Sequence, residues 1–497
     1  MGALLLTDLA IRAQDLHAMY TDEGMFSRAE ICRRATSLWN WSFHFGSGTW
    51  EYQAILFGVA GLLALALLVG FETRLSTVGS WLLLVSIQHR VPPILSGAEI
   101  LMRMLLFWAM FLPLERAWSV DRWRRGTGGV RNPIPNDCEP VLSVASAAIL
   151  LQIGLMYLFS AIPKTNAQWL HGDALGGILA HDFYALPPAA LFLRFPVLLK
   201  FMTWGTLLLE CAAPVLLFFP RGSAGVRLAL IAALAMMHLG IDICLEVGLF
   251  SYVSLAGLAL FLPSEFWSSR LLGRLMRSSA MEARRAQTGQ RFSRKPHRLF
   301  YVTQGLCLIA LVYLLAVSLN SLPAHPLAPL APEKWRLFNR GLGLSQSWGM
   351  FAAVPSNNGW YVARAKLRDG SEVDLLRQGA PLDWNRPEFP ARGYRNHFWH
   401  KLFREMSYFD EQGFQVFRPP VAEYLCRTWS AAHPQEKQVA EFEFVFCTAD
   451  AANAKNASMA QVRRKQLIRL DFLSQYERPA VSGFSDANQA SLGAQAR

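Results

Sequence analysis

The sequence predicts an all-α polytopic membrane domain of about nine helices, followed by a smaller extracytoplasmic α+β domain. Three observations predict this class. Of the 497 residues, 53% are hydrophobic, which is too apolar for a soluble chain of this size. The apolar residues gather in blocks of about 20, the length that crosses a bilayer. After residue 333 the pattern changes to short runs typical of β-strands.

Eight apolar blocks are candidate membrane helices: residues 52–71, 76–90, 98–114, 141–162, 197–219, 225–245, 249–266 and 299–320. The N-terminal stretch MGALLLTDLAIRAQDL is apolar for only about a dozen residues, too few to span the bilayer. It also lacks the basic start and the cleavage site of a signal peptide. We expect it to be the C-terminal half of a ninth, first helix, begun upstream or entering the bilayer only partway. The predicted membrane domain is residues 1–320.

Arginine and lysine crowd into loops 115–139 and 267–298, whereas loops 91–97 and 246–248 are nearly free of positive charge. Positively charged loops stay in the cytoplasm. This distribution predicts a multi-pass protein of the cell inner membrane with a cytoplasmic N-terminus and an extracytoplasmic C-terminal domain. The net charge of +12 therefore reflects membrane orientation, and we expect the lipid bilayer rather than nucleic acid as partner.

The region after the last span begins with proline at every third position, in residues 321–332. Such spacing favours a stiff polyproline II linker. Residues 333–480 are the predicted extracytoplasmic β-rich domain, and the polar tail 481–497 is expected to be disordered.

Within the C-terminal domain, WYVARAKL and SEVDLL flank Asp369-Gly370, which predicts a β-hairpin. EFEFVFCTA at 441–449 is a second β-rich run, and NHFWHKLFREMSYF at 396–409 predicts an amphipathic helix. A disulfide between Cys426 and Cys447 is allowed outside the cytoplasm but not required.

Charged residues inside apolar spans are costly and mark candidate sites. Glu99 and Arg103 are spaced i, i+4 and can pair with each other. His238, Asp242 and Glu246 also repeat every four residues, so they lie on one helical face. That face could bind a metal, relay protons or form a polar seam between helices. No metal-binding signature accompanies it, so we predict no metal site.

Lys164 and Glu210 are the other two candidates. Glu210 has about ten apolar residues on either side, and Lys164 follows YLFSAIP at the outer end of a span. A lysine held out of water there loses its proton more easily and can act as a general base. The alternative is a lysine whose ammonium extends to the interfacial water.

Several segments, taken together, resemble the HTTM (horizontally transferred transmembrane) domain, a family that includes the vitamin K-dependent γ-carboxylase. They are YTDEGMFSR (20–28), the Trp39–Gly48 stretch, RMLLFWAMFLPL with WSVD (103–121), YLFSAIPKTNAQWLHGDAL (157–175) and, after the helix of His238, VGLFSYVSLAGLALF (247–261). Their order and spacing run through roughly residues 1–265. QSWGMF (346–351) and the hairpin after it resemble the start of the carboxylase's lumenal region.

The resemblance implies roles for three residues. Lys164 matches the lysine that deprotonates reduced vitamin K, within a stretch where Tyr157 and Trp169 also match. Glu210 matches an acidic residue of the helix that follows, and His238 matches a histidine before the GxFSYV motif. The pattern departs at Glu115-Arg116, where the carboxylase has an Asn-His pair, and this puts the quinone chemistry in doubt.

Two functions are consistent with these patterns. The first is a quinol-linked, carboxylase-like (lyase) enzyme with Lys164, His238 and Glu210 as catalytic residues, a reduced, vitamin K-like quinone as cofactor and an extracytoplasmic protein substrate. The alternative is a non-catalytic membrane-anchored assembly or binding protein for a secreted partner. A transporter is less consistent, because no repeated half and no pair of broken helices is present.

Overall fold

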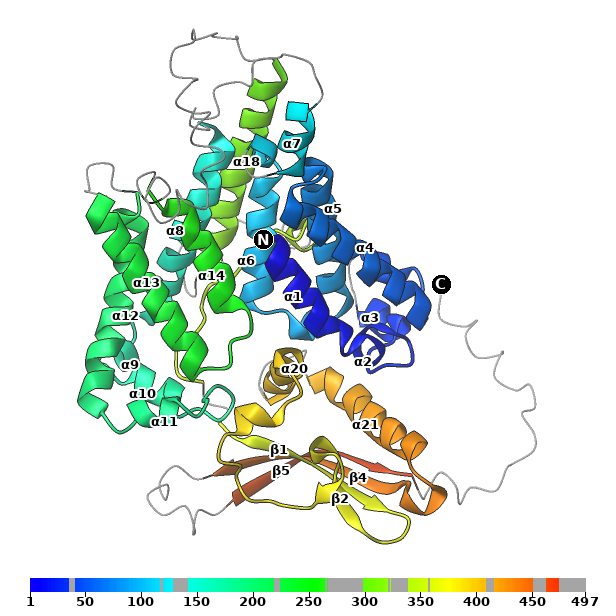
Figure 1. Cartoon of the computed structure of the whole chain (residues 1–497). Coiled ribbons are helices and arrows are strands. Elements are labelled where there is room, and N and C mark those ends of the chain that lie inside the picture. The colour runs from blue at the N-terminus through cyan, green and yellow to red at the C-terminus, as the bar shows by residue number, and fades with distance from the viewer. Residues whose placement is uncertain are drawn as a thin grey trace, which may run out of the picture. The chain divides into compact units, whose positions relative to one another are not determined.

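The structure is a computed structural model (Figure 1) that describes residues 1–34, 41–116, 119–127, 142–218, 224–263, 266, 298–320, 322, 338–355, 358–407, 415–449 and 462–472. The chain divides into two compact units. The first consists of Met1–Trp360 and Pro387–Val416, and the second of Tyr361–Arg386 and Phe417–Arg497. The predicted proline-rich linker, apart from Leu322, and the predicted disordered tail lie outside the described residues.

Among the residues that the structure describes, five helices of the first unit are long and apolar enough to cross a bilayer, and the chain is a multi-pass membrane protein. They are α4 (Trp50–Val69), α8 (Val144–Ala161, continued by a turn to Lys164), α12 (Pro196–Leu216), α13 (Ala224–Cys244) and α18 (Arg298–Asn320). The predicted number of about nine spanning helices is not confirmed.

The other predicted spans are helical but shorter or more polar. They are α1 (Gly2–Ala13), α5 (Thr73–Arg90), α6 (Gly97–Ala109) and α14 (Phe250–Leu258). At about 1.5 Å per residue, the 13 residues of α6 extend only about 20 Å, less than the apolar core of a bilayer. In α5 the apolar run is interrupted by buried Ser, Thr, Gln, His and Arg side chains.

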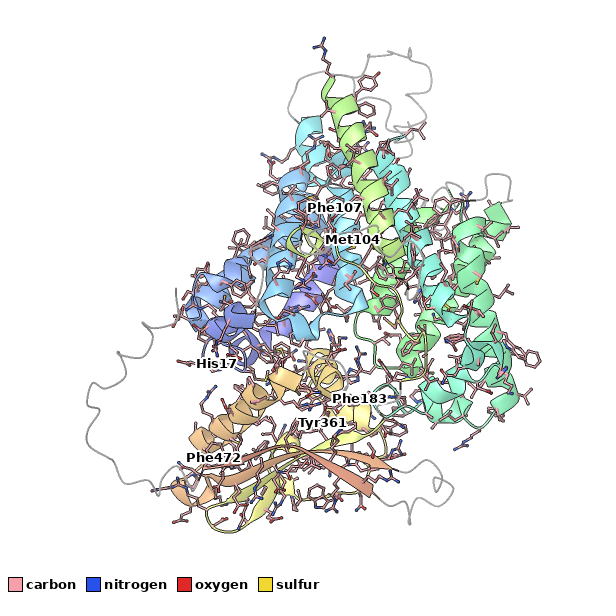
Figure 2. The ribbon with its side chains drawn as sticks, turned by 180° about the vertical axis from the view of Figure 1, so that it is seen from behind. His17, Met104, Phe107, Phe183, Tyr361 and Phe472 are labelled. Carbon is pink, nitrogen blue, oxygen red and sulfur yellow. The ribbon has the colours of Figure 1, made fainter. Side chains whose placement is uncertain are left out.

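The described part of the first unit also contains shorter helices: α2 (Leu16–Tyr20), α3 (Arg28–Arg34), α7 (Val120–Thr127), α9 (Ala167–Leu170), α10 (Ala174–Leu179), α11 (Ala189–Phe192) and α20 (His397–Ser407). Helix α12 packs on α8, and α14 packs on α6 and α13. Met104 of α6 is buried in this helical core, and Phe107 on the same helix is half-buried (Figure 2). Helix α20 forms within the range that the sequence predicted, and it belongs to this unit.

In the residues that the structure describes, the second unit contains a five-stranded sheet with the order β3-β2-β1-β4-β5. Its strands are β1 (Trp360–Leu367), β2 (Glu372–Asp374), β3 (Ala380–Pro381), β4 (Val439–Ala449) and β5 (Val462–Asp471), and α21 (Arg418–Ala432) packs on β4 and β5. The predicted hairpin is confirmed: β1 pairs antiparallel with β2 around Gly370, whose φ of +85° suits glycine. The predicted run at 441–449 is confirmed as most of β4.

The sheet has an apolar side and a polar side. Phe442 and Phe444 of β4 are fully buried, and the ring of Tyr361, labelled in Figure 2, stacks on Phe444. On the polar side, the Arg364 guanidinium forms ion pairs with Glu372 and Glu443. Cys426 and Cys447, for which the sequence allowed a disulfide, are buried free thiols and do not form one.

Candidate functional site

A cavity of about 570 Å³ lies within the first unit, walled by helices α6, α8, α12, α13, α14 and α20 and by the loop 347–355. Its wall is mostly aliphatic and aromatic. The apolar residues include Leu95, Ile100, Met156, Trp169, Ile178, Met237, Ile241, Phe250 and Trp348. Lys164, Glu210 and His238, predicted from three separate helices, all line this one cavity.

Lys164 is buried and forms an ion pair with Glu210. Pro163 ends α8 in a tight turn, and Lys164 Nζ then lies 2.6 Å from both carboxylate oxygens of Glu210 on α12. The same nitrogen donates to Ser160 Oγ at 2.9 Å and lies 5.1 Å from the centroid of the Trp169 ring. Only 3% of Lys164 and 6% of Glu210 is exposed, so the ammonium does not extend to interfacial water.

His238 lies near this pair and bonds to a different partner. Its Nε2 is 2.9 Å from the hydroxyl of Tyr157 on α8, and both residues are buried. The three residues predicted to share a face of α13 do not all line the cavity. His238 and Glu246 line it, whereas Asp242 accepts a hydrogen bond from the Tyr252 hydroxyl at 2.7 Å. Burial raises the pKa of Glu246, which follows the end of α13.

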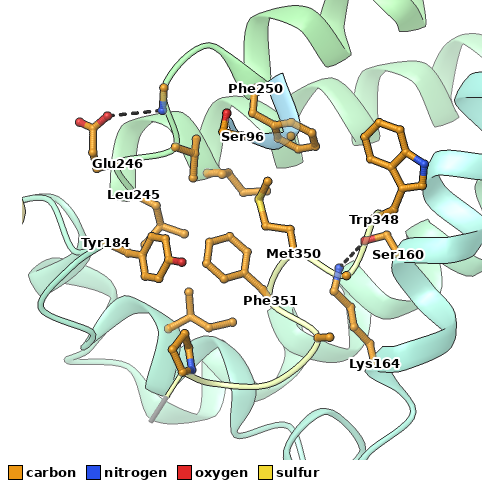
Figure 3. Close-up of a pocket in the computed structure, with 18 of the residues that line it drawn as sticks. Ser96, Ser160, Lys164, Tyr184, Leu245, Glu246, Phe250, Trp348, Met350 and Phe351 are labelled. Carbon is orange, nitrogen blue, oxygen red and sulfur yellow. Dashed lines mark hydrogen bonds between the residues drawn. The ribbon is translucent and has the colours of Figure 1, made fainter. Parts of the chain in front are cut away.

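The loop 345–355 crosses the cavity, and its backbone is fixed from several helices. Arg103 donates to the carbonyl of Ser345, Trp169 Nε1 to that of Phe351 and Asn166 to that of Ala352. Phe351 has a φ of +56°, a conformation that a phenylalanine adopts only under strain. Figure 3 shows Met350 and Phe351 between Tyr184 and Lys164, with their side chains in the middle of the cavity.

Helix α20 supplies a further wall that the sequence did not reveal. His397, His400, Lys401 and Arg404, spaced i, i+3, i+4 and i+7, all line the cavity. The opposite face is in the core, with Phe398, Leu402, Phe403 and Met406 buried. The amphipathic pattern predicted the helix correctly. It did not show that the polar face meets a cavity rather than bulk water.

The expected Glu99–Arg103 pair does not form in the part of the chain that the structure describes. Glu99 Oε1 lies 3.3 Å from Arg12 Nη2, and Arg12 Nε lies 2.7 Å from Asp8. Arg103 donates instead to Gln88 Oε1 at 2.5 Å and to the backbone of the cavity loop. Glu99 is therefore paired with Arg12, which is 87 residues away in the sequence, and not with Arg103, which is four residues away.

Comparison with known families gives one result. Residues 47–267 match the family model of the HTTM domain. The chain contains an HTTM domain. Searches of curated proteins and of solved structures found no match.

The HTTM domain contributes Lys164, Glu210 and His238 to the cavity, while α20 and the loop 345–355 lie beyond the matched residues. The first 46 residues also lie outside the match, so the resemblance predicted for them stays a prediction.

Glu115 and Arg116 of the HTTM domain form a short helical turn and are not among the described residues that line the cavity. Glu115 lies instead 3.8 Å from Arg74. The departure from the Asn-His pattern at these two positions therefore does not change the chemistry of the cavity wall.

Proposed function

We propose that this chain is a membrane enzyme related to the vitamin K-dependent γ-carboxylase, in which Lys164 is the general base that acts on a reduced quinone. The observation that supports it most is that Lys164, Glu210 and His238 line one apolar cavity with the amine out of water. The proposal includes an inner-membrane location with a cytoplasmic N-terminus and an extracytoplasmic protein substrate.

A reduced quinone suits the cavity in size and polarity. A volume of about 570 Å³ is typical of small-molecule sites, and the aliphatic and aromatic wall suits an apolar ring and tail. When bound, a reduced quinone supplies an acidic hydroxyl and an oxidisable ring.

For Lys164 to accept a proton, its ammonium must first lose one, and Glu210 is the acceptor in contact with it. Moving the proton from Nζ to the carboxylate breaks an N–H bond, forms an O–H bond and leaves a neutral amine beside a neutral acid. Burial reduces the advantage of the charged pair over this neutral one. The amine can then take a proton from a hydroxyl in the cavity, while Ser160 and Glu210 hold it in place.

The test is turnover of a reduced, isoprenoid-tailed naphthoquinol by the purified full chain in nanodiscs with O2 and CO2, followed by mass spectrometry of the quinone products. Lys164→Ala is expected to lower the rate by about 10²–10⁴-fold, the typical contribution of a general base. The matched control is Lys200→Ala, since Lys200 is exposed and pairs with Asp173 away from the cavity wall. Wild-type rates in Lys164→Ala would refute the role.

A second function, a non-catalytic membrane-anchored binding protein for a secreted partner, is supported by the second unit. Its sheet has an open hollow of about 440 Å³ lined by Arg364, Trp384 and Arg464, among others, with the Arg464 guanidinium 4.0 Å from the Trp384 ring centroid. If the wild-type chain consumes no quinol but retains a secreted protein on co-purification, this second function replaces the first.

A further inference from the structure

The stripe of His397, His400, Lys401 and Arg404 gives the cavity a second set of polar groups, on a different helix from Lys164 and Glu210. All four side chains are largely withdrawn from solvent, and Lys401 and Arg404 are only 16% and 17% exposed. Cations are rarely buried without a counterion. A ligand in this part of the cavity must therefore suit the charges of Lys401 and Arg404 and of the groups that already pair with them.

One carboxylate, Glu405, contacts both cations. Lys401 Nζ and Arg404 Nη2 both reach the same atom, Glu405 Oε1. The Arg404 guanidinium also lies 5.2 Å from the centroid of the Tyr184 ring, and the charge of Glu99 on α6 acts on Lys401. His400 is fixed by a hydrogen bond from its ring to the carbonyl of Phe183.

Lys401 and Arg404 share the carboxylate of Glu405, and both side chains are rich in hydrogen-bond donors. An ammonium has three N–H groups and a guanidinium five, and neither can accept. Burial, and then the nearby Arg404, lowers the pKa of Lys401 to about 8, so its charge is only partly compensated by Glu405. A ligand group placed here must therefore be an acceptor, and a negative charge on it would stabilise the ammonium.

We propose that the α20 end of the cavity, through Lys401 and Arg404, binds the carboxylate or phosphate head of an amphipathic ligand whose apolar body lies along the aliphatic and aromatic wall. The two cations lie three residues apart on one helix face, so both can reach the same head group. The site rests on the cavity and on α20, not on the chemistry proposed for Lys164.

The test is binding of two single-chain acids, palmitate and lysophosphatidic acid, to the full chain in a neutral detergent. The uncharged counterparts are methyl palmitate and monopalmitoylglycerol. Each acid is expected to bind about tenfold or more tightly than its counterpart, as for charge-assisted hydrogen bonds. If only palmitate binds, the ligand head group is a carboxylate. If only lysophosphatidic acid binds, the head group is a phosphate. If neither acid binds better than its neutral counterpart, the proposal is wrong.

Variants connect this binding to α20. Lys401→Gln with Glu405→Gln keeps the local charge balanced and is expected to lose the preference for the acid. Glu405→Gln alone removes the competing carboxylate and is expected to tighten acid binding, which keeps the test decisive if the double variant unfolds. Arg392→Gln, at an exposed position off the cavity wall, is the matched control. An unchanged preference in a folded double variant would overturn the proposal.

Acid binding should also weaken as pH rises through about 8, because only the ammonium form of Lys401 attracts an anion. Binding of the neutral counterparts should not change over this range. Lys164→Ala should retain acid binding, so the failure of this site and the failure of the proposed quinol chemistry are distinguishable.

Discussion

Replacing Lys164 by methionine is expected to lower the free energy of unfolding of the first unit by about 3–5 kcal/mol. The substitution leaves the Glu210 carboxylate buried at 6% exposure without the ammonium that now lies 2.6 Å from both its oxygens. Glu210→Leu should have a similar effect, since it leaves the ammonium buried instead. The double variant Lys164→Met/Glu210→Leu removes both charges and is expected to recover most of the loss.

Unfolding by sodium dodecyl sulfate in mixed micelles measures these differences. Lys200→Met is the matched control, because Lys200 and Asp173 form an ion pair at 3.4 Å with both side chains about half exposed. Lys200→Met should lower the free energy of unfolding by less than about 1 kcal/mol. If the double variant is as unstable as the sum of the single ones, the two charges are not coupled, and the proton transfer proposed between them loses its basis.

The second large effect is expected at Arg12, which holds two carboxylates of the first unit. Arg12 lies 2.7 Å from Asp8 and 3.3 Å from Glu99, and its guanidinium lies 4.0 Å from the centroid of the Phe398 ring on α20. Arg12→Met removes the cation from between two buried acids, and we expect a loss of about 3–5 kcal/mol. Hydrogen exchange of α20 should also become faster, because the contact with Phe398 is lost.

The control for Arg12 is another arginine–aspartate pair near the N-terminus. Arg28 and Asp22 lie 2.8 Å apart with about a third of each side chain exposed, so Arg28→Met should cost less than about 1 kcal/mol. Equal losses for Arg12→Met and Arg28→Met would show that the buried cluster does not hold α20 on the membrane helices.

Local patterns were enough to predict much of the fold. The long apolar runs predicted α4, α8, α12, α13 and α18, and Asp369-Gly370 between alternating residues predicted the hairpin. The predicted spans are not confirmed where helices are short, as in α6, because an apolar run shows burial but not whether lipid or protein provides it. Local patterns missed β5, because half of its residues (VRRKQLIRLD) are charged and the strand pairs only at the edge of the sheet.

The candidate site was predicted in part for a similar reason. Lys164, Glu210 and His238 stand out because a polar group in an apolar run is costly wherever the fold places it. Lys401 and Arg404 do not stand out, since cations on an amphipathic helix usually face water. The contacts of Arg12 with Glu99 and of Arg103 with Ser345 join residues far apart in the chain, and no local period predicts such pairs.

Because the chain passes from the first unit to the second, back and again to the second, parts of the two units are synthesised alternately. The ribosome completes the first hairpin of the sheet before it delivers Pro387–Val416 to the helical unit, and only then makes β4 and β5. A protein cut at residue 333 would carry α20 away with the C-terminal fragment. That fragment would expose Phe398 and Leu402 to water, and the remainder would have its cavity open on one side. Deletion of the C-terminal region therefore alters the membrane cavity as well, and phenotypes of such truncations cannot be ascribed to the sheet alone.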